Sequence, residues 1–414
     1  MDELIDPTPA RPDPGKALTG IPGLDEITNG GFPAGRPTLI SGGPGSGKTL
    51  LGITFLVNGA TLYGEPGVLM TFEENVADLV NDVKELGYDL PALIAEKKLL
   101  VDYVHVERSE IEETGEYDLE PLFIRLDHAI KSIGAKRVVL DTIESLFSGL
   151  QSEGILRAEL RRLFRWLRDR ELTAVITGER GEKTLTRHGL EEYVTDAVIS
   201  LDHRVHDQIS TRRIRVVKYR GSHHGTNEYP FLIDVDGLSV LPVTSLGLEH
   251  GASSERVSTG LAPLDGMLGG AGFYRGSTIL VSGPAGTGKT TLAAHLVEAS
   301  CRRGERCLFF LFEESPAQML RNMLAAGVDL KPWVDSGQLQ FQAERPSRYG
   351  LETHLALVHR AVDRFKPDVV VIDPMTNLLS VGTQLDVRAM LTRLIDFLKM
   401  RNITAVFNNL TSAG

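Results

Sequence analysis

Two stretches of this chain have residue types and a spacing that suit the binding of phosphate groups. Both read Gly-x-x-x-x-Gly-Lys-Thr, at residues 42–49 and 283–290. Glycine lets consecutive main-chain N–H groups point into one concave surface, and the helix that follows such a loop adds unpaired donors and a favourable dipole. The lysine then reaches the β- and γ-phosphates of a nucleoside triphosphate, and the threonine hydroxyl binds Mg²⁺. The candidate nucleotide-binding residues are Gly42, Gly43, Pro44, Gly45, Ser46, Gly47, Lys48, Thr49 and Leu50 in the first copy, and Gly283, Pro284, Ala285, Gly286, Thr287, Gly288, Lys289, Thr290 and Thr291 in the second.

An aspartate ends a short apolar run in each half of the chain. These residues are Asp141 and Asp373, and each follows a run of valine, leucine and isoleucine. The α/β sheets place ligand-binding side chains at the carboxyl ends of their strands. We therefore expect Asp141 to hold the magnesium shell together with Thr49, directly or through water, and Asp373 to do the same with Thr290.

A pair of glutamates ends another apolar run in each half. Glu73–Glu74 and Glu313–Glu314 follow runs that predict buried strands. A carboxylate there can orient and deprotonate an attacking water, and an adjacent carboxylate raises its basicity. The alternative is an acidic pair that only stabilises the start of the next helix. Because the pair recurs beside a phosphate loop, we favour catalysis, but the sequence does not separate the base from its helper.

A basic cluster follows in the first half only. Lys218 and Arg220 lie two residues apart in a predicted strand, so their side chains are expected to project to the same face. One hypothesis is a finger that reaches the γ-phosphate bound by a neighbouring subunit. The other is a solvated, charged strand end. The residues alone do not decide between them.

The elements that position these residues are repeated along the chain. In both halves the phosphate loop lies between an apolar run and a helix-like stretch, and further runs alternate with amphipathic stretches. Strands that are apolar throughout and alternate with helices predict a mostly parallel, twisted sheet covered by helices on both faces. We therefore predict an α/β fold with two tandem P-loop NTPase domains.

The repeat also predicts the domain boundaries. We expect a disordered, proline-rich leader over residues 1–18, a first domain over 19–245, a linker over 246–257 and a second domain over 258–414. Residues 182–245 of the first copy have no counterpart in the second. The second domain is thus expected to stop before its last strands, which would leave a sheet edge uncovered.

Composition narrows the class of protein. The net charge of −11 argues against a chain devoted to coating nucleic acid, and its two cysteines do not make a metal-binding set. The amino terminus lacks the cationic and apolar regions of a signal peptide, and no apolar run reaches the length that crosses a bilayer. We expect a cytoplasmic protein without a membrane anchor. No Asn-Lys-x-Asp motif selects guanine, so ATP is the expected nucleotide.

Taken together, these motifs resemble the KaiC family, the two-domain RecA-like ATPases and autokinases of the cyanobacterial clock and their bacterial relatives. The resemblance rests on both loops, both glutamate pairs and four further stretches. These are the Thr-Gly-x-x-x-Leu-Asp openings at 19–25 and 259–265, Leu-Glu-Glu-Tyr-Val-Thr-Asp at 190–196, Lys-x-Arg-Gly-x-x-His at 218–224 and Glu-Tyr-Pro-Phe at 228–231. It implies tandem RecA-like domains and a hexamer with ATP and Mg²⁺ between subunits. Lys218 and Arg220 would act in trans, and Tyr219, Ser222 and His224 would join the nucleotide-binding residues.

The resemblance also separates the roles of the two domains. In the family the first domain is a slow ATPase, and the second phosphorylates its own adjacent Ser/Thr pair. The aligned positions in the first domain are Glu192 and Tyr193, as expected for a domain without kinase activity. Those of the second domain would fall beyond Gly414, so we expect no autokinase activity from this chain.

Other functions share several of these features. A DNA-acting RecA-like recombinase or helicase would have the same fold and loops, and a scaffold could use ATP only to assemble a ring. The partners expected from the resemblance are further copies of the chain and Kai-type or signalling proteins, whereas binding of nucleic acid is not expected.

Overall fold

The computed structural model describes residues 15–104, 119–147, 153–181, 195–206, 209–234, 237–242 and 253–411. The chain divides into two compact units, one made of residues up to 242 except 205–211, and the other of the remainder. We call them the first and second unit and describe each separately. The predicted acceptor-equivalent positions Glu192 and Tyr193 lie outside the described residues.

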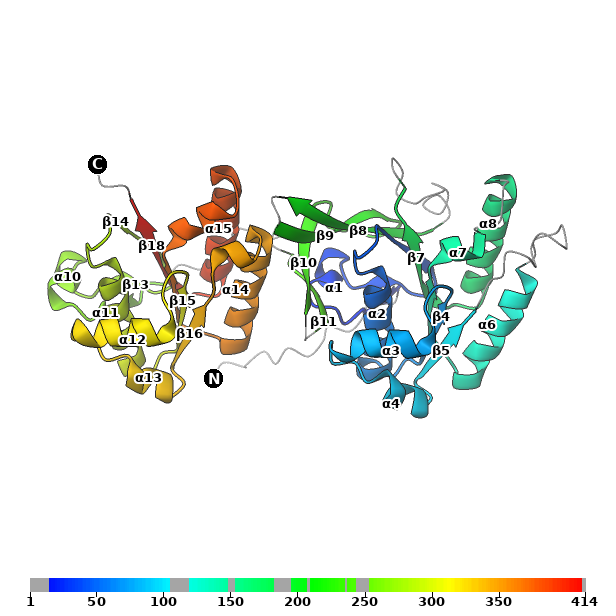
Figure 1. The fold of residues 1–414 in the computed structure, drawn as a ribbon, viewed down its shortest axis with the longest axis horizontal. Helices are drawn as coiled ribbons and strands as arrows, with labels where there is room; N and C mark the ends of the chain where they lie inside the picture. The colour runs from blue at the N-terminus through cyan, green and yellow to red at the C-terminus, as the bar shows by residue number, and fades with distance from the viewer. Residues whose placement is uncertain are drawn as a thin grey trace. The chain divides into compact units, whose positions relative to one another are not determined.

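Strands and helices alternate in the first unit, as the apolar runs predict (Figure 1). Its elements are β1 (Lys16–Ala17), α1 (Leu24–Ile27), β2 (Phe32–Pro33), β3 (Pro37–Gly42), α2 (Lys48–Leu62), β4 (Gly67–Thr71), α3 (Val76–Lys84), α4 (Leu90–Ala95), β5 (Leu99–Tyr103), α6 (Glu120–Ile133), β6 (Arg137–Asp141), α7 (Ile143–Phe147), α8 (Glu153–Asp169), β7 (Thr173–Glu179), β8 (Ala197–His206), β9 (Ile209–Tyr219), β10 (Glu228–Asp234) and β11 (Gly237–Val240).

One large sheet organises these elements. Over the described residues it has nine strands in the order β11-β10-β9-β8-β3-β7-β6-β4-β5. From β8 to β5 the neighbouring strands are parallel, whereas β10 pairs antiparallel with both β9 and β11. The carboxyl ends of β3, β4 and β6 therefore meet at one edge of the sheet, which is where the predicted site residues belong.

Helices cover both faces of this sheet. On one face α2 packs through Leu51 and Phe55 against alternate strand residues such as Ile40 and Val139. On the other face α6 and α8 form a separate apolar cluster with the neighbouring strand positions, as the placement of α6 and α8 in Figure 1 shows. Strands buried on both faces read as continuous apolar runs, so the predicted α/β fold class is confirmed.

The second unit repeats this plan with fewer described strands. Its elements are β12 (Arg256–Val257), α10 (Ala262–Met267), β13 (Phe273–Tyr274), β14 (Thr278–Gly283), α11 (Lys289–Arg302), β15 (Cys307–Leu311), α12 (Pro316–Ala325), α13 (Lys331–Asp335), β16 (Leu339–Ala343), the 3₁₀ turn η1 (Pro346–Arg348), α14 (Leu351–Phe365), β17 (Val369–Asp373), the 3₁₀ turn η2 (Met375–Ser380), α15 (Gln384–Met400) and β18 (Thr404–Leu410).

The parallel sheet of the second unit ends at its phosphate-loop strand in the described part. Its order is β14-β18-β17-β15-β16, so β14 is an edge strand there, whereas its counterpart β3 lies between β7 and β8. The exposed fraction of Leu280 is accordingly 60%, whereas Leu39 and Ile40 of β3 are fully buried. The loop that follows β14 is therefore more open than the first loop.

Ordered structure begins earlier in each unit than the predicted boundaries. Lys16–Ala17 pair with β2, so the end of the predicted leader belongs to the first unit, and Arg256–Val257 of the predicted linker pair with β13. The Thr-Gly-x-x-x-Leu-Asp motif explains why, because Asp25 accepts hydrogen bonds from Thr19 N and Oγ1 and from Gly20 N. This carboxylate closes the turn that leads from β1 into α1.

Candidate nucleotide-binding site

The first phosphate loop connects β3 to α2, as its sequence context predicts. Gly45 and Gly47 have φ values of 67° and 93°, which only glycine adopts without strain. Lys48 Nζ donates to the carbonyl oxygens of Gly42 (2.8 Å) and Gly43 (3.0 Å), so the ammonium group lies over the loop. Ser46 Oγ is buried and has no hydrogen-bond partner among the described residues, which suits a loop shaped around an acceptor.

Asp141 is hydrogen-bonded to the hydroxyl group of Thr49, the last residue of the phosphate-loop motif. Thr49 Oγ1 donates a 2.8 Å hydrogen bond to Asp141 Oδ2, and Thr177 donates to Oδ1 of the same carboxylate. Burial raises the pKa of Asp141, and the two hydroxyl donors oppose that rise. A hydroxyl and one carboxylate fit Mg²⁺, which takes oxygen ligands and fills its shell with water and phosphate oxygens. No larger cluster of metal-ligating side chains occurs in the part of the chain that the structure describes.

The first glutamate pair lies between β4 and α3 at the same edge. Glu73 Oε1 accepts a hydrogen bond of 2.9 Å from Ser145 Oγ in α7, which fixes the direction of this carboxylate. The pKa of Glu74 is raised by burial, next by the charge of Asp82, and then by those of Asp141 and Glu73. Glu74 is therefore close enough to Asp141, the expected magnesium ligand, for the two charges to interact.

The basic cluster, Lys218 and Arg220, lies near the start of β8, whereas the phosphate loop lies further along that strand. β9 runs back along β8, and Arg220 N donates to Asp196 O, one residue before β8 begins. Leu201, five residues later in β8, pairs with Gly42 at the start of the phosphate loop. At ~3.3 Å per residue the separation along β8 is roughly 16 Å, which is beyond the reach of an arginine side chain. Arg220 cannot contact phosphates held by its own loop.

The two basic residues lie at the end of β9 and differ in their surroundings. β9 ends at Tyr219, so Arg220 lies after the strand and strand alternation does not fix its direction. The Arg220 side chain is exposed, while Lys218 Nζ donates to Thr195 O at 2.8 Å. The expectation that both side chains project from one strand face therefore stays a prediction.

The remaining predicted residues of this segment have local partners. Tyr219 is buried, its hydroxyl donates to Gly31 O at 2.9 Å, and its ring stacks under Lys16 Nζ. Ser222 Oγ accepts from Lys16 Nζ at 2.6 Å, and His224 Nδ1 lies 3.1 Å from Gly225 O. The Tyr219 ring belongs to the core of its unit, which leaves only its main chain for a ligand. Leu50 of the loop is likewise buried by its side chain.

The second loop repeats the first in its main contacts. Gly286 and Gly288 again have positive φ, and Lys289 Nζ donates to Gly283 O (2.7 Å) and Pro284 O (2.6 Å). Burial raises the pKa of Asp373, and the hydroxyl of Thr290 opposes the rise. The same oxygen donors are therefore in place for a metal ion.

Two residues that the sequence analysis missed distinguish the acidic pairs. Asn377 Nδ2 donates to Glu313 Oε1 at 3.1 Å, and it occupies the position of Ser145, four residues after the strand-end aspartate. Asn322 Nδ2 lies 3.3 Å from both carboxylate oxygens of Glu314. The first unit has Asp82 at this position, eight residues after Glu74. Aligning the two halves residue by residue outside the motifs would have found Asn377 and Asn322.

The geometry of two loops, each with an aspartate and a glutamate pair at one sheet edge, agrees with a match to known proteins. The model of the KaiC ATPase family matches residues 17–245 and 257–413. The chain belongs to the KaiC family. Family membership makes it a P-loop ATPase by class, with tandem RecA-like domains and ATP as the nucleotide.

Curated KaiC relatives extend along almost the whole chain. The chain is 59% identical over 399 residues to the circadian clock protein KaiC2 of Synechocystis sp., covering 96% of this chain and 70% of that protein. It is 38% identical to the circadian clock oscillator protein KaiC of Parathermosynechococcus lividus, with 96% of this chain and 73% of that protein covered. The KaiC of Synechococcus elongatus is 37% identical, with 95% and 76% covered. Among the described helices, none is both long enough and apolar enough to span a membrane.

Proposed function

We propose that the first unit hydrolyses ATP with Mg²⁺ at the sheet edge formed by β3, β4 and β6. The hydrogen bond between Thr49 and Asp141 carries this proposal, because it joins the phosphate loop to a buried carboxylate from a distant strand. The loop N–H groups and Lys48 hold the phosphates, and Thr49 and Asp141 hold Mg²⁺. The bound ion would neutralise charge on the phosphate oxygens.

Glu73 and Glu74 activate the attacking water in this proposal. Ser145 orients Glu73, while the raised pKa of Glu74 makes it a stronger proton acceptor once ionised. The charge of Glu73 contributes to the raised pKa of Glu74. Glu73→Gln and Glu74→Gln, measured singly and together, test the pair. Both single variants should lose turnover while retaining binding of ATP.

We further propose a ring in which Lys218 and Arg220 complete the site of a neighbouring copy. Arg220 is exposed and about 16 Å along β8 from its own loop, which supports action in trans. An arginine supplied in this way can accelerate phosphoryl transfer by about 10³–10⁵. The family suggests a hexamer in the cytoplasm, and native mass spectrometry with ATP tests the number of copies.

Mixing two inactive variants tests the direction of this contact. Lys48→Ala subunits keep Arg220, and Arg220→Ala subunits keep an intact loop. If the finger acts in trans, mixed rings regain hydrolysis at interfaces that combine the two intact parts. Each variant alone should stay inactive, and the Arg220→Ala protein should still bind ATP. A mixture as inactive as its components, despite mixed rings in the mass spectrum, would contradict the proposal.

For the second unit we propose binding of ATP with Mg²⁺ through Lys289, Thr290 and Asp373. Glu313 and Glu314 are its acidic pair, and the family suggests an autokinase type of domain. We expect no stable phosphorylation of this 414-residue chain, which incubation with radiolabelled ATP tests. The names of the relatives suggest a role in a clock or in related signalling, with Kai-type partners. Turnover that single-stranded DNA leaves unchanged would separate this function from that of a DNA-acting motor.

A further inference from the structure

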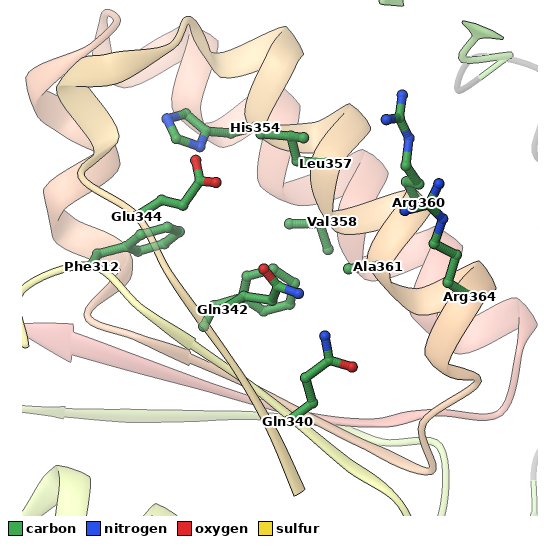
Figure 2. A pocket seen from close by; sticks show the side chains of 11 residues that line it. Phe312, Gln340, Gln342, Glu344, His354, Leu357, Val358, Arg360, Ala361 and Arg364 are labelled. Carbon is green, nitrogen blue, oxygen red and sulfur yellow. The ribbon is translucent and has the colours of Figure 1, made fainter. Parts of the chain in front are cut away.

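The second unit contains a cavity that lies on the face of the sheet behind its acidic pair. Its volume is about 230 Å³, and it is enclosed by β15, β16 and α14 (Figure 2). Phe310 and Phe312 form the apolar floor, and Phe312 directly precedes Glu313. No residue of the phosphate loop lines it. The cavity is therefore separate from the proposed nucleotide site.

Apolar side chains occupy the equivalent strand positions of the first unit. Strand pairing aligns Leu100 with Gln340, and the same register aligns Val104 with Glu344. In the first unit Leu100 and Val104 pack against the cluster beneath α6. Polar side chains, Gln340 and Glu344, replace both of them in the second unit.

The helices that cover this region, α6 and α14, also differ by a polar residue in place of an apolar one. Helices α6 and α14 are each followed by a residue in the left-handed conformation, Gly134 and Lys366. Both residues lie at the same distance before the next strand, so the two helices can be aligned on them. This alignment places Leu122 opposite His354. Leu122 belongs to the apolar cluster, whereas His354 is buried beside the cavity. His354 Nε2 donates to Pro346 O at 2.8 Å, which holds the ring in place, and burial lowers the pKa of the ring.

An ion pair lies at the equivalent position of the first unit. Arg125 of α6 donates two hydrogen bonds of 2.6 Å to Asp102 of β5. The aligned residues of the second unit are Leu357 and Gln342, which cannot form this pair. Positive charge lies instead at Arg360 and Arg364, one helical turn apart on α14 and lining the cavity.

The lining has a distinct distribution of polar groups. Glu344 Oε2 is buried and has no hydrogen-bond partner among the described residues. In Figure 2 Glu344 and His354 lie at one end of the cavity, Gln340 lies at the other, and Arg360 and Arg364 follow one another along α14. An acceptor, an amide and two guanidinium groups thus surround an aromatic floor. Sites for small ligands combine an apolar wall with a few convergent polar groups in this way.

We propose that this cavity binds a small planar organic anion. Its ring lies on Phe310 and Phe312, its acid group faces Arg360 and Arg364, and a donor on its other end faces Glu344. Guanidinium groups suit carboxylates because of their fixed, forked donors. The buried Glu344 oxygen disfavours an anion in the reverse orientation, since two like charges would then be adjacent.

The probe for this proposal is 4-aminobenzoate, which has a ring, an acid group and an opposite N–H donor. Its binding to the full chain is measured by ligand-observed NMR in the presence of saturating ATP analogue and Mg²⁺, so that both loops are filled. Benzoate lacks the donor and 4-aminobenzamide lacks the charge. Both should bind at least about tenfold more weakly than 4-aminobenzoate. No saturable binding of 4-aminobenzoate at millimolar concentration would overturn the proposal.

Matched variants locate the binding. Gln340→Leu with Glu344→Val installs the residues of the first unit, and should abolish binding while the urea midpoint of the second unit is kept or raised. Arg360→Gln with Arg364→Gln should reduce the preference for 4-aminobenzoate over 4-aminobenzamide. If either double variant binds the probe as the parent chain does, the site is not this cavity. Lys289→Ala is a control for the loop and should leave probe binding unchanged.

Discussion

Thr49 Oγ1 donates a hydrogen bond of 2.8 Å to Asp141 Oδ2, which lies 92 residues further along the chain. Thr49 is in the first turn of α2, and Asp141 is the last residue of β6. They meet because β3 and β6 are parallel strands of one sheet on either side of β7, so their carboxyl ends share one edge. This relationship places the two oxygen atoms that we propose as Mg²⁺ ligands beside the phosphate loop.

Substitution of the two loop lysines should have unequal effects. Lys48→Ala should lower steady-state ATP hydrolysis by about 10²-fold or more, because the first unit combines its loop with the basic residues proposed to act in trans. Lys289→Ala is the matched control and should retain most of the turnover. Phosphate release at saturating ATP measures both. Equal losses in the two variants would contradict the assignment of hydrolysis to the first unit.

The charge at Asp82 should set the pH dependence of hydrolysis. After burial, Asp82 is the largest cause of the raised pKa of Glu74. Asp82→Asn removes that negative charge and should lower the pKa of Glu74. The acidic limb of the pH–rate profile should therefore move to lower pH. Asp78→Asn removes a more weakly contributing charge and should move the limb less. An unmoved limb in Asp82→Asn would show that Glu74 does not titrate in turnover.

Arg137 should be required for the stability of the first unit. Its side chain is 1% exposed, and it donates to Glu65 Oε2 (2.7 Å), Phe55 O and Leu18 O (2.9 Å each). Arg137→Met removes the guanidinium donors to Phe55 O and Leu18 O and leaves Glu65 without its partner, which should cost about 3 kcal/mol. Urea unfolding followed by Trp166 fluorescence, in a Trp333→Phe background, measures the first unit.

An exposed arginine provides the control for this measurement. Arg125 pairs with Asp102, and its side chain is 50% exposed. Arg125→Met should cost less than about 1 kcal/mol because solvent screens such pairs. Comparable losses for Arg125→Met and Arg137→Met would refute the special role of the buried guanidinium.

Asp265 should make the second unit sensitive to acid. Burial alone would raise its pKa, but hydrogen bonds from Ser258 and Thr259 outweigh burial and lower it. A carboxyl whose folded pKa is below its unfolded value stabilises the fold above the unfolded value, near pH 4. That stability is lost as the pH falls through the folded pKa. Urea midpoints of the second unit, followed by Trp333 fluorescence, should therefore fall between pH 5 and about pH 3.

The corresponding variants separate this carboxyl from the general effect of acid. Asp265→Asn should lower the midpoint at pH 7 and reduce its further fall towards pH 3. Asp335→Asn removes an exposed carboxylate that pairs with Lys331 and should follow the parent chain. A parent-like pH dependence in Asp265→Asn would exclude Asp265 as its source.

The chemistry and the fold class were predictable from the sequence, because both depend on local patterns. The Gly-x-x-x-x-Gly-Lys-Thr spacing specifies a loop, and continuous apolar runs that end in Asp141 or Glu73–Glu74 specify buried parallel strands. The doubling of every pattern indicated two units. Sequence periodicity does not reveal β1 and β12, because strands of two residues are too short to show a period.

Only the tertiary structure decided which of these residues act together. Sheet order brings Thr49 to Asp141 and Ser145 to Glu73, and it places Arg220 at the far edge from its own loop. These relationships depend on the pairing of strands that are distant in the chain, which local periodicity does not encode. The sequence by itself determined two phosphate loops with their acidic partners. The tertiary structure decided that Arg220 lies far from the loop of its own unit and that a cavity lies behind the second acidic pair.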